Sequence, residues 1–88
     1  MNSKEQKLII DNLLSSGEVF ARCAGIISSD YFEPDYRNVV QYIKEYADKY
    51  GAVPKFDLVN AKFDKDFVKR NVTTAEIKST CDDVELFC

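Results

Sequence analysis

The segment PDYRNVVQYIKEYADKYG, residues 34–51, decides the fold class of this chain. Its apolar residues recur every three or four positions, which is the spacing of one face of an α-helix. They are Tyr36, Val39, Val40, Ile43, Tyr46, Ala47 and Tyr50. Pro34 suits the first helical turn and Gly51 suits a left-handed C-terminal cap, so the segment predicts an amphipathic helix between them. Its apolar face covers about 120°, and Tyr42 widens it to about 160°, which favours contact with more than one neighbouring element.

Shorter helical patterns precede this segment. Ser3 followed by Gln6 is typical of a capping box, which predicts the start of a first helix. The polar break SSG at residues 15–17 ends that helix and starts a second, short one. Tyr31 and Phe32 follow another polar break, and both are expected to fill the core from a single helical turn.

Two further helices are expected after the long one. Pro54 introduces a short helical pattern at residues 56–63, whereas residues 64–72 show no clear pattern. Thr73 with Glu76 forms a second capping box and predicts the start of the last helix. That helix has acidic residues in its final turns and no glycine cap, so we expect it to continue past Cys88 in a longer protein. A frayed natural terminus is the alternative.

The predicted fold class is therefore all-α, a small orthogonal or globular bundle of about five to six helices. Residues 1–88 form a single helical domain, with an expected radius of gyration of roughly 12 Å. Hydrophobic residues make up 45% of the chain and charged residues 31%, which is enough to build a core. No apolar run approaches the ~18 residues that span a bilayer, and no signal peptide is evident. We therefore expect a cytoplasmic protein with no membrane partner.

The cysteines and the charges exclude several classes of site. Three widely spaced cysteines, Cys23, Cys81 and Cys88, favour reduced and mostly buried thiols over a disulfide framework. The chain has no histidine and a net charge of −3, which disfavours a zinc site and a dedicated nucleic-acid surface. The local basic cluster is interrupted by acidic residues, so any DNA binding should be weak. That cluster comprises Lys62, Lys65, Lys69 and Arg70.

No catalytic, cofactor-binding or metal-binding residue is predicted. The sequence has no glycine-rich phosphate loop, and a serine–histidine or cysteine–histidine pair is impossible without histidine. Asp64 and Asp66 resemble the start of a calcium loop, but Lys69 stands where glycine is needed and Ala75 replaces the final glutamate. A metal-dependent enzyme that uses Asp64, Lys65 and Asp66 is the alternative, and a solvated turn is the simpler interpretation.

Aromatic residues are the more informative feature. The chain has five tyrosines and six phenylalanines, of which several are expected in the core: Phe20, Phe32, Tyr36 and Phe63. Tyr42 and Tyr46 lie at one edge of the long helix, where amphipathic aromatic side chains suit either the core or an interface. With the neighbouring Lys49, they are the candidate protein interface.

The stretch DYFEPDYRNVV, residues 30–40, resembles the N-terminal domain of DnaB-type replicative DNA helicases of bacteria and bacteriophages. The matching residues are Tyr31, Phe32, Glu33, Pro34 and Arg37, with Gly51 and Pro54 at the far end of the long helix. Tyr36 departs from the family, which commonly has histidine there. The helical hairpin that follows in the family is absent or only begun at residues 74–88.

The resemblance implies a non-catalytic assembly and docking module in DNA replication. Such a domain self-associates in a dimer or a hexameric ring and contacts primase or a helicase loader. In the family, ATP hydrolysis and DNA translocation belong to a separate C-terminal domain, which would give the full-length parent its helicase activity. A stand-alone helical regulator, phage-encoded and bound to a replication or host protein, is the alternative.

Overall fold

A computed structural model describes residues 2–88, and within them every regular element is helical. The elements are α1 (Ser3–Ser15), α2 (Gly17–Cys23), the 3-10 helix η1 (Ser29–Tyr31), α3 (Pro34–Tyr50), α4 (Phe56–Phe63) and α5 (Thr74–Phe87). The Cα radius of gyration is 11.6 Å, close to the value expected for this length. The all-α prediction is confirmed.

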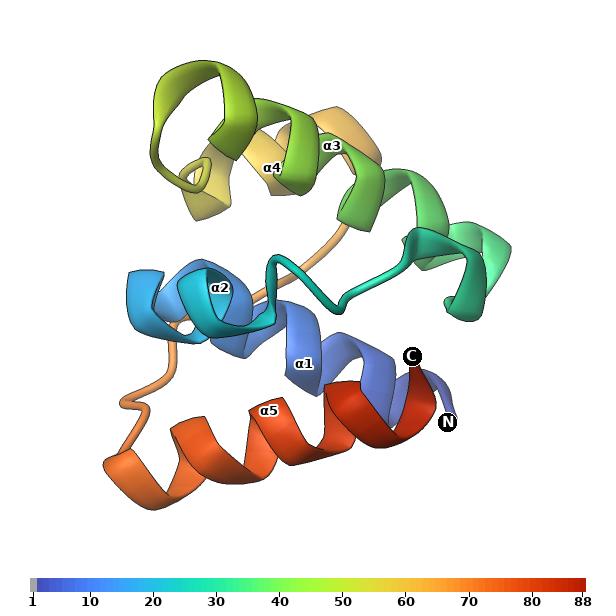
Figure 1. Ribbon diagram of the computed structural model, residues 1–88. Helices are drawn as coiled ribbons and strands as arrows, with labels where there is room; N and C mark the ends of the chain where they lie inside the picture. Colours follow the sequence, from blue (N-terminus) through green and yellow to red (C-terminus); the bar gives the residue numbers. More distant parts are fainter. Residues whose placement is uncertain (1) are drawn as a thin grey trace.

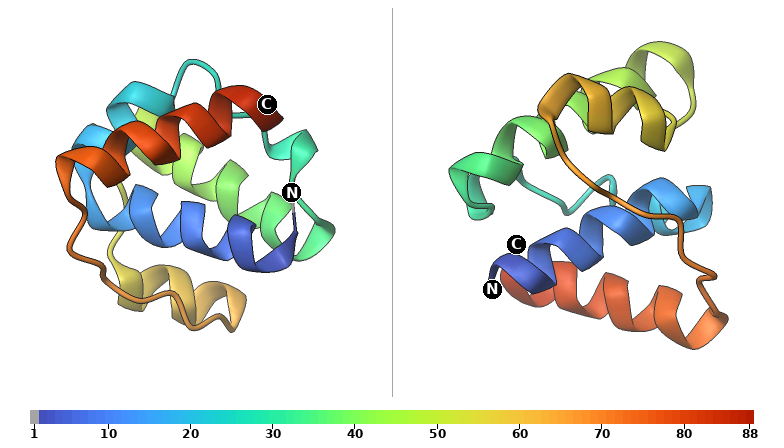
Figure 2. Two further views of the ribbon diagram at one scale, coloured as in Figure 1. Left: turned by 90° about the horizontal axis from the view of Figure 1, so that it is seen from below. Right: turned by 180° about the vertical axis from the view of Figure 1, so that it is seen from behind.

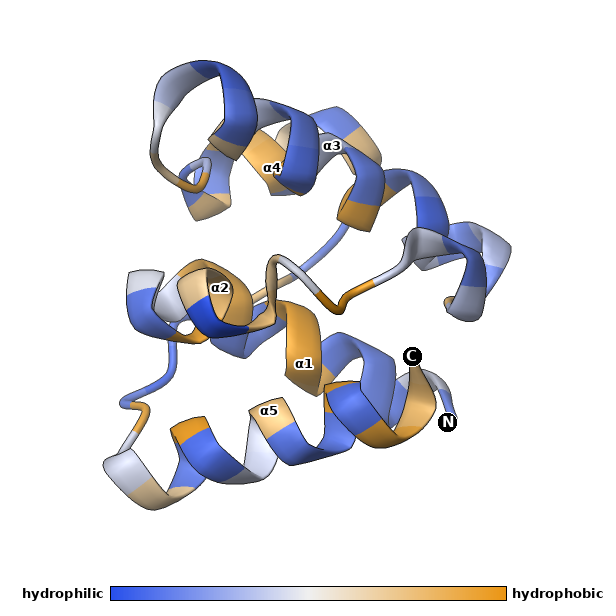
Figure 3. Cartoon of the chain, in the orientation of Figure 1, coloured by the Kyte–Doolittle hydropathy of each residue, from blue (hydrophilic) through white to orange (hydrophobic). Residues whose placement is uncertain are grey.

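The helices form three layers, with α1 and α2 in the middle (Figure 1). Helices α3 and α4 cover one side of this middle layer, and α5 covers the other. An extended segment, residues 64–73, carries the chain from α4 past the middle layer to α5 (Figure 2). Hydrophobic residues concentrate on α1 at the centre of the molecule, whereas the outer turns of α3 and α5 are largely hydrophilic (Figure 3).

Helix α1 begins one residue earlier than the capping box predicted. Asn2 is the N-cap, and its Oδ1 accepts a hydrogen bond of 2.9 Å from the backbone N–H of Glu5. Ser3 and Gln6 instead reach across to the start of α3. The Ser3 hydroxyl donates to the Glu33 carboxylate at 2.7 Å, and the Glu33 N–H donates to Gln6 Oε1 at 2.8 Å. The predicted capping box at Ser3 is therefore wrong, because the side chains of Ser3 and Gln6 both bind Glu33, which is distant in the sequence.

The predicted long helix is confirmed at both ends. Pro34 occupies the first turn of α3, and Gly51 ends the helix with φ of 73°. Val39, Val40 and Ile43 are buried against the middle layer. Burial falls along the helix, and Tyr50 at its C-terminal end is 60% exposed.

The aromatic pair that precedes α3 is split between core and surface. Phe32 is buried, as predicted, but Tyr31 is 60% exposed. Tyr31 ends the 3-10 helix η1, none of whose residues is buried, whereas Phe32 is its C-cap with an extended backbone, so the two side chains leave the chain in different directions. The prediction that Tyr31 fills the core is wrong for this reason.

Helix α5 begins where the second capping box predicted. The hydroxyl of Thr73 accepts a hydrogen bond of 3.2 Å from the backbone N–H of Glu76. Ile77 and Val84 are buried, while Thr80 accepts a 3.0 Å hydrogen bond from the Asn12 amide of α1. Apolar contacts and one buried polar pair thus hold α5 on the middle layer.

A buried carboxylate of α1 fixes the extended segment that the sequence left undefined. Asp11 is 0% exposed, and its Oδ1 accepts a 3.1 Å hydrogen bond from the Val68 N–H. Its Oδ2 lies 3.1 Å from Arg70 Nε and 3.3 Å from Lys7 Nζ. The backbone N–H of Arg70 also donates to Ser15 Oγ at 2.9 Å. These contacts satisfy the carboxylate and bind residues 68–70 to the middle layer.

Truncating this carboxylate should destabilise the protein strongly. Asp11→Ala leaves the Val68 N–H and two cations without their partner, so we expect a loss of about 2–4 kcal/mol in the free energy of unfolding. Glu18→Ala is the control, because Glu18 forms an exposed pair with Arg22 and its loss should cost less than about 0.5 kcal/mol. Urea unfolding followed by circular dichroism measures both. Equal stabilities of the two variants would contradict the role given to Asp11.

The glycine cap of α3 gives a second prediction. Gly51→Ala should cost about 1 kcal/mol, because alanine is strained at positive φ, although no atom lies within 4 Å of the added Cβ. Gly17→Ala is the matched control, since it also has open space but no positive φ. We expect that variant to be neutral or slightly more stable in thermal unfolding. A neutral Gly51→Ala variant would show that the cap contributes little.

Candidate protein-docking surface

Three tyrosines of α3 follow one another at i, i+4 spacing and form a tyrosine strip: Tyr42, Tyr46 and Tyr50. The ring centroids of Tyr42 and Tyr46 are 5.9 Å apart, and those of Tyr46 and Tyr50 are 4.5 Å apart. One helical turn separates each pair, so the rings lie along one edge of the helix. The strip runs from the core to the exposed end of α3.

Helix α4 supplies the second side of this surface. The Phe63 ring packs edge-on against Tyr42 at 5.5 Å, and Leu58 is 43% exposed beside the strip. Leu58 and the tyrosine strip border an open hollow of about 400 Å³. Its lining residues are Tyr42, Glu45, Tyr46, Lys49, Tyr50 and Leu58. The chain therefore leaves a contiguous aromatic and aliphatic surface without covering it.

The structure places the two predicted interface tyrosines between core and surface. Tyr42 is partly buried and packs against the hydrophobic core, so one side of it is structural. Tyr46 is also partly buried, and Lys49 is exposed. The sequence prediction did not include Tyr50 or Leu58 in the interface. The i, i+4 continuation from Tyr46 could have indicated Tyr50, whereas Leu58 joins the surface only through the packing of α4.

Charged side chains surround the tyrosine strip. Lys49 Nζ lies 5.2 Å from the centroid of the Tyr50 ring, and Lys62 Nζ lies 5.3 Å from that of Tyr42. Glu45 supplies a carboxylate to the same hollow. The surface thus has an aromatic centre and a rim that carries both signs of charge, which is the usual anatomy of a protein–protein interface.

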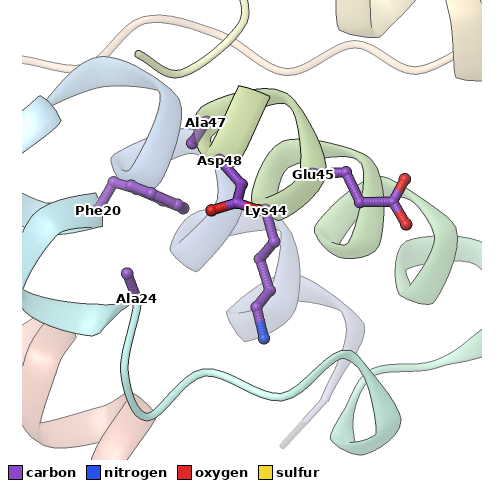
Figure 4. Close-up of a pocket in the computed structure, with 6 residues that line it drawn as sticks. All are labelled: Phe20, Ala24, Lys44, Glu45, Ala47 and Asp48. Carbon is purple, nitrogen blue, oxygen red and sulfur yellow. The ribbon is translucent and has the colours of Figure 1, made fainter. Parts of the chain in front are cut away.

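A second hollow, of about 390 Å³, lies between α2 and α3 (Figure 4). Its lining includes Phe20 and Ala24 on one side and Lys44 and Asp48 on the other. The ammonium group of Lys44 already donates a 2.8 Å hydrogen bond to the Ile27 carbonyl. That lysine joins the segment after α2 to α3, so its contact is structural.

The basic cluster is largely occupied within the chain. Lys62 lies over the Tyr42 ring, and Lys65 Nζ is 5.3 Å from the centroid of the Tyr36 ring. Arg70 pairs with Asp11. These intramolecular contacts compete with any phosphate for three of the four cations, although Lys62 and Arg70 are exposed, as Lys69 is.

The acidic pair near residue 65 does not gather a metal-ligand set. Asp64 ends α4 as a left-handed C-cap with φ of 54°, and its backbone is therefore part of the turn. Within residues 2–88, no three cysteine, aspartate or glutamate side chains lie close enough together to hold a metal ion. The two carboxylates thus belong to the turn that leads into the extended segment.

The residues that resemble the helicase family lie around the two ends of α3. Glu33 joins α3 to Gln6, and Arg37 Nη2 donates a 3.2 Å hydrogen bond to the Phe32 carbonyl. Pro34 and Gly51 set the ends of α3, while Pro54 is buried below its C-terminus. Except for the exposed Tyr31, these residues have structural roles.

Comparisons with protein-family models, curated proteins and solved structures found no match to this chain. The resemblance to the helicase domain therefore depends on the quoted residues alone. Among residues 2–88, no helix combines the length and the apolar character that crossing a membrane requires.

Proposed function

We propose that this chain is a non-catalytic assembly and docking module that self-associates through the tyrosine strip. The single observation that carries the proposal is the uncovered aromatic surface at the end of α3, where Tyr50 is 60% exposed and its tilted ring packs against Tyr46. Tyrosine is enriched at interface centres because its ring gives a large contact area and its hydroxyl tolerates water.

The tyrosine strip is suited to binding because its rings already pack against one another. Tyr46 packs against both neighbouring tyrosines, so association would freeze few additional side-chain rotations. Leu58 adds aliphatic area beside the rings. A partner that covers these residues gains apolar burial without a large entropic cost.

A second copy of the chain is the occupant that the rim charges favour. Lys49 and Lys62 contact the rings at the rim, and Glu45 lies beside them in the same hollow. In a two-fold symmetric dimer, a residue of one copy that contacts a second residue of the partner is matched by the reverse contact. The lysines of one copy can therefore face the glutamate of its partner.

We assign this module to DNA replication, as the N-terminal domain of a DnaB-type helicase in the cytoplasm. Support comes from the segment at residues 31–37, which fixes the start of α3, and from Gly51 and Pro54 at its end. In that assignment the self-association belongs to a dimer or ring, and primase or a helicase loader is the further partner. A stand-alone phage regulator would use the same surface. The reading frame after Cys88 separates the two, because only the helicase continues into a nucleotide-binding loop.

Replacing two tyrosines of the strip tests the self-association. Tyr46→Ser with Tyr50→Ser removes the exposed rings, so we expect the dimer dissociation constant to rise at least tenfold in sedimentation equilibrium. Tyr31→Ser is the control, since Tyr31 is as exposed as Tyr50 but lies on η1 before α3. That variant should associate as the wild type does.

Two outcomes would overturn the proposal. One is a wild-type chain that remains monomeric at millimolar concentration, and the other is an equal loss of association in the Tyr31→Ser control. Thermal unfolding of each variant is measured in parallel, because Tyr46 is partly buried. Tyr50→Ser alone should leave the melting temperature unchanged, and it tests the surface if the double variant unfolds.

A further inference from the structure

Two cysteines from distant parts of the chain meet between α2 and α5. Cys23 ends α2, and Cys81 lies in the middle of α5. Their sulfur atoms are 3.5 Å apart, and the Cys23 thiol donates to Cys81 Sγ. All three cysteines are free thiols. The two helices pack side by side, so the contact belongs to a stable interface between them (Figure 2).

We propose that Cys23 and Cys81 form a thiol pair that low-molecular-weight disulfides such as oxidised glutathione convert into an intramolecular disulfide. The bond would join α2 to α5 across the middle of the molecule. A disulfide requires a sulfur–sulfur distance of about 2.05 Å, so the atoms must approach by roughly 1.5 Å. Side-chain rotation with a small shift of α5 supplies such a movement.

The exposure of the two sulfurs determines which cysteine reacts first with the oxidant. Cys81 is partly exposed, whereas Cys23 is fully buried. Burial, together with the hydrogen bond to Cys81, raises the pKa of Cys23 to about 12, which keeps this thiol protonated and unreactive at first. Cys81 is therefore the thiol that meets the oxidant, and Cys23 is the resolving thiol.

The reaction balances as two thiol–disulfide exchanges. The Cys81 thiol loses its proton to solvent, and its thiolate attacks one sulfur of oxidised glutathione. This forms a mixed disulfide and releases one glutathione thiolate, which takes up a proton. The Cys23 sulfur then attacks the Cys81 sulfur and expels the second glutathione as a thiolate, which takes up the proton that Cys23 loses. The two protein thiols are oxidised by two electrons, and one glutathione disulfide is reduced to two thiols.

The third cysteine provides the internal comparison. Cys88 is also partly exposed, and its Sγ lies 4.0 Å from the Ser28 carbonyl oxygen. Cys81 lies in α5, and Cys88 is the C-cap of the same helix, seven residues further on. About two helical turns therefore separate the two cysteines by about 10 Å along the axis, which is too far for a disulfide. Geometry therefore selects Cys23 as the partner of Cys81.

Oxidation of the Cys88→Ser variant tests the pairing. The folded protein is incubated with oxidised glutathione, remaining thiols are alkylated, and disulfides are mapped by non-reducing mass spectrometry. We expect a Cys23–Cys81 bond within a monomer. Its melting temperature should rise by on the order of 10 °C and return to the starting value with a reductant, because the bond closes a long loop.

Two further variants serve as controls. Cys81→Ser should show neither the bond nor the rise in melting temperature. Cys23→Ser should stop at the mixed disulfide of Cys81 with glutathione. Since Cys23 is buried and its replacement can unfold the protein, Cys81→Ser is the decisive negative control.

The proposal is overturned if Cys81 of the folded Cys88→Ser variant retains glutathione without closing the bond. It is equally overturned if the oxidised wild type forms only disulfide-linked dimers. These results are independent of the tyrosine strip, which contains no cysteine.

Discussion

The buried Asp11 carboxylate is the interaction on which the arrangement of the layers depends. A carboxylate without solvent contact is costly unless several donors surround it, and here a backbone N–H, an arginine and a lysine do so. Two of those donors, Val68 and Arg70, come from the extended segment between α4 and α5. Satisfying one charge on α1 thus fixes the path by which the chain crosses the molecule.

The contacts that position α3 also explain why the tyrosine strip stays uncovered. The Gln6 contact with Glu33 fixes the start of α3 over α1, and Val39, Val40 and Ile43 bury its first half. Beyond Ile43 no residue of α3 is buried, and the tyrosine strip lies on the edge of the helix that faces α4 rather than the middle layer. Only the short helix α4 reaches the strip, through the contact of Phe63 with Tyr42. The part of the tyrosine strip that α4 leaves exposed is the surface that we assign to a second copy of the chain.

Local signals predicted most helices, and long-range contacts account for the errors. The proline and glycine at the ends of α3 and the Thr73 cap of α5 act within one helical turn, and these predictions are confirmed. The predicted cap at Ser3 and the core position of Tyr31 are wrong. Ser3 is drawn away by Glu33, while Tyr31 is turned outwards by a 3-10 geometry that composition does not reveal. Tyr42 and Tyr46 could be proposed from spacing, but Leu58 could not.

The sequence by itself determined that the chain is all-α, where its longest helix begins and ends, and which edge of that helix carries tyrosines. Those properties depend on the helical period and on end residues, which operate over a few positions. The tertiary structure alone decided that Asp11 meets Arg70 and that Cys23 meets Cys81, contacts separated by 59 and 58 positions. It also decided how far the strip is exposed. Such pairings depend on how the helices pack across three layers, and no local pattern encodes those angles.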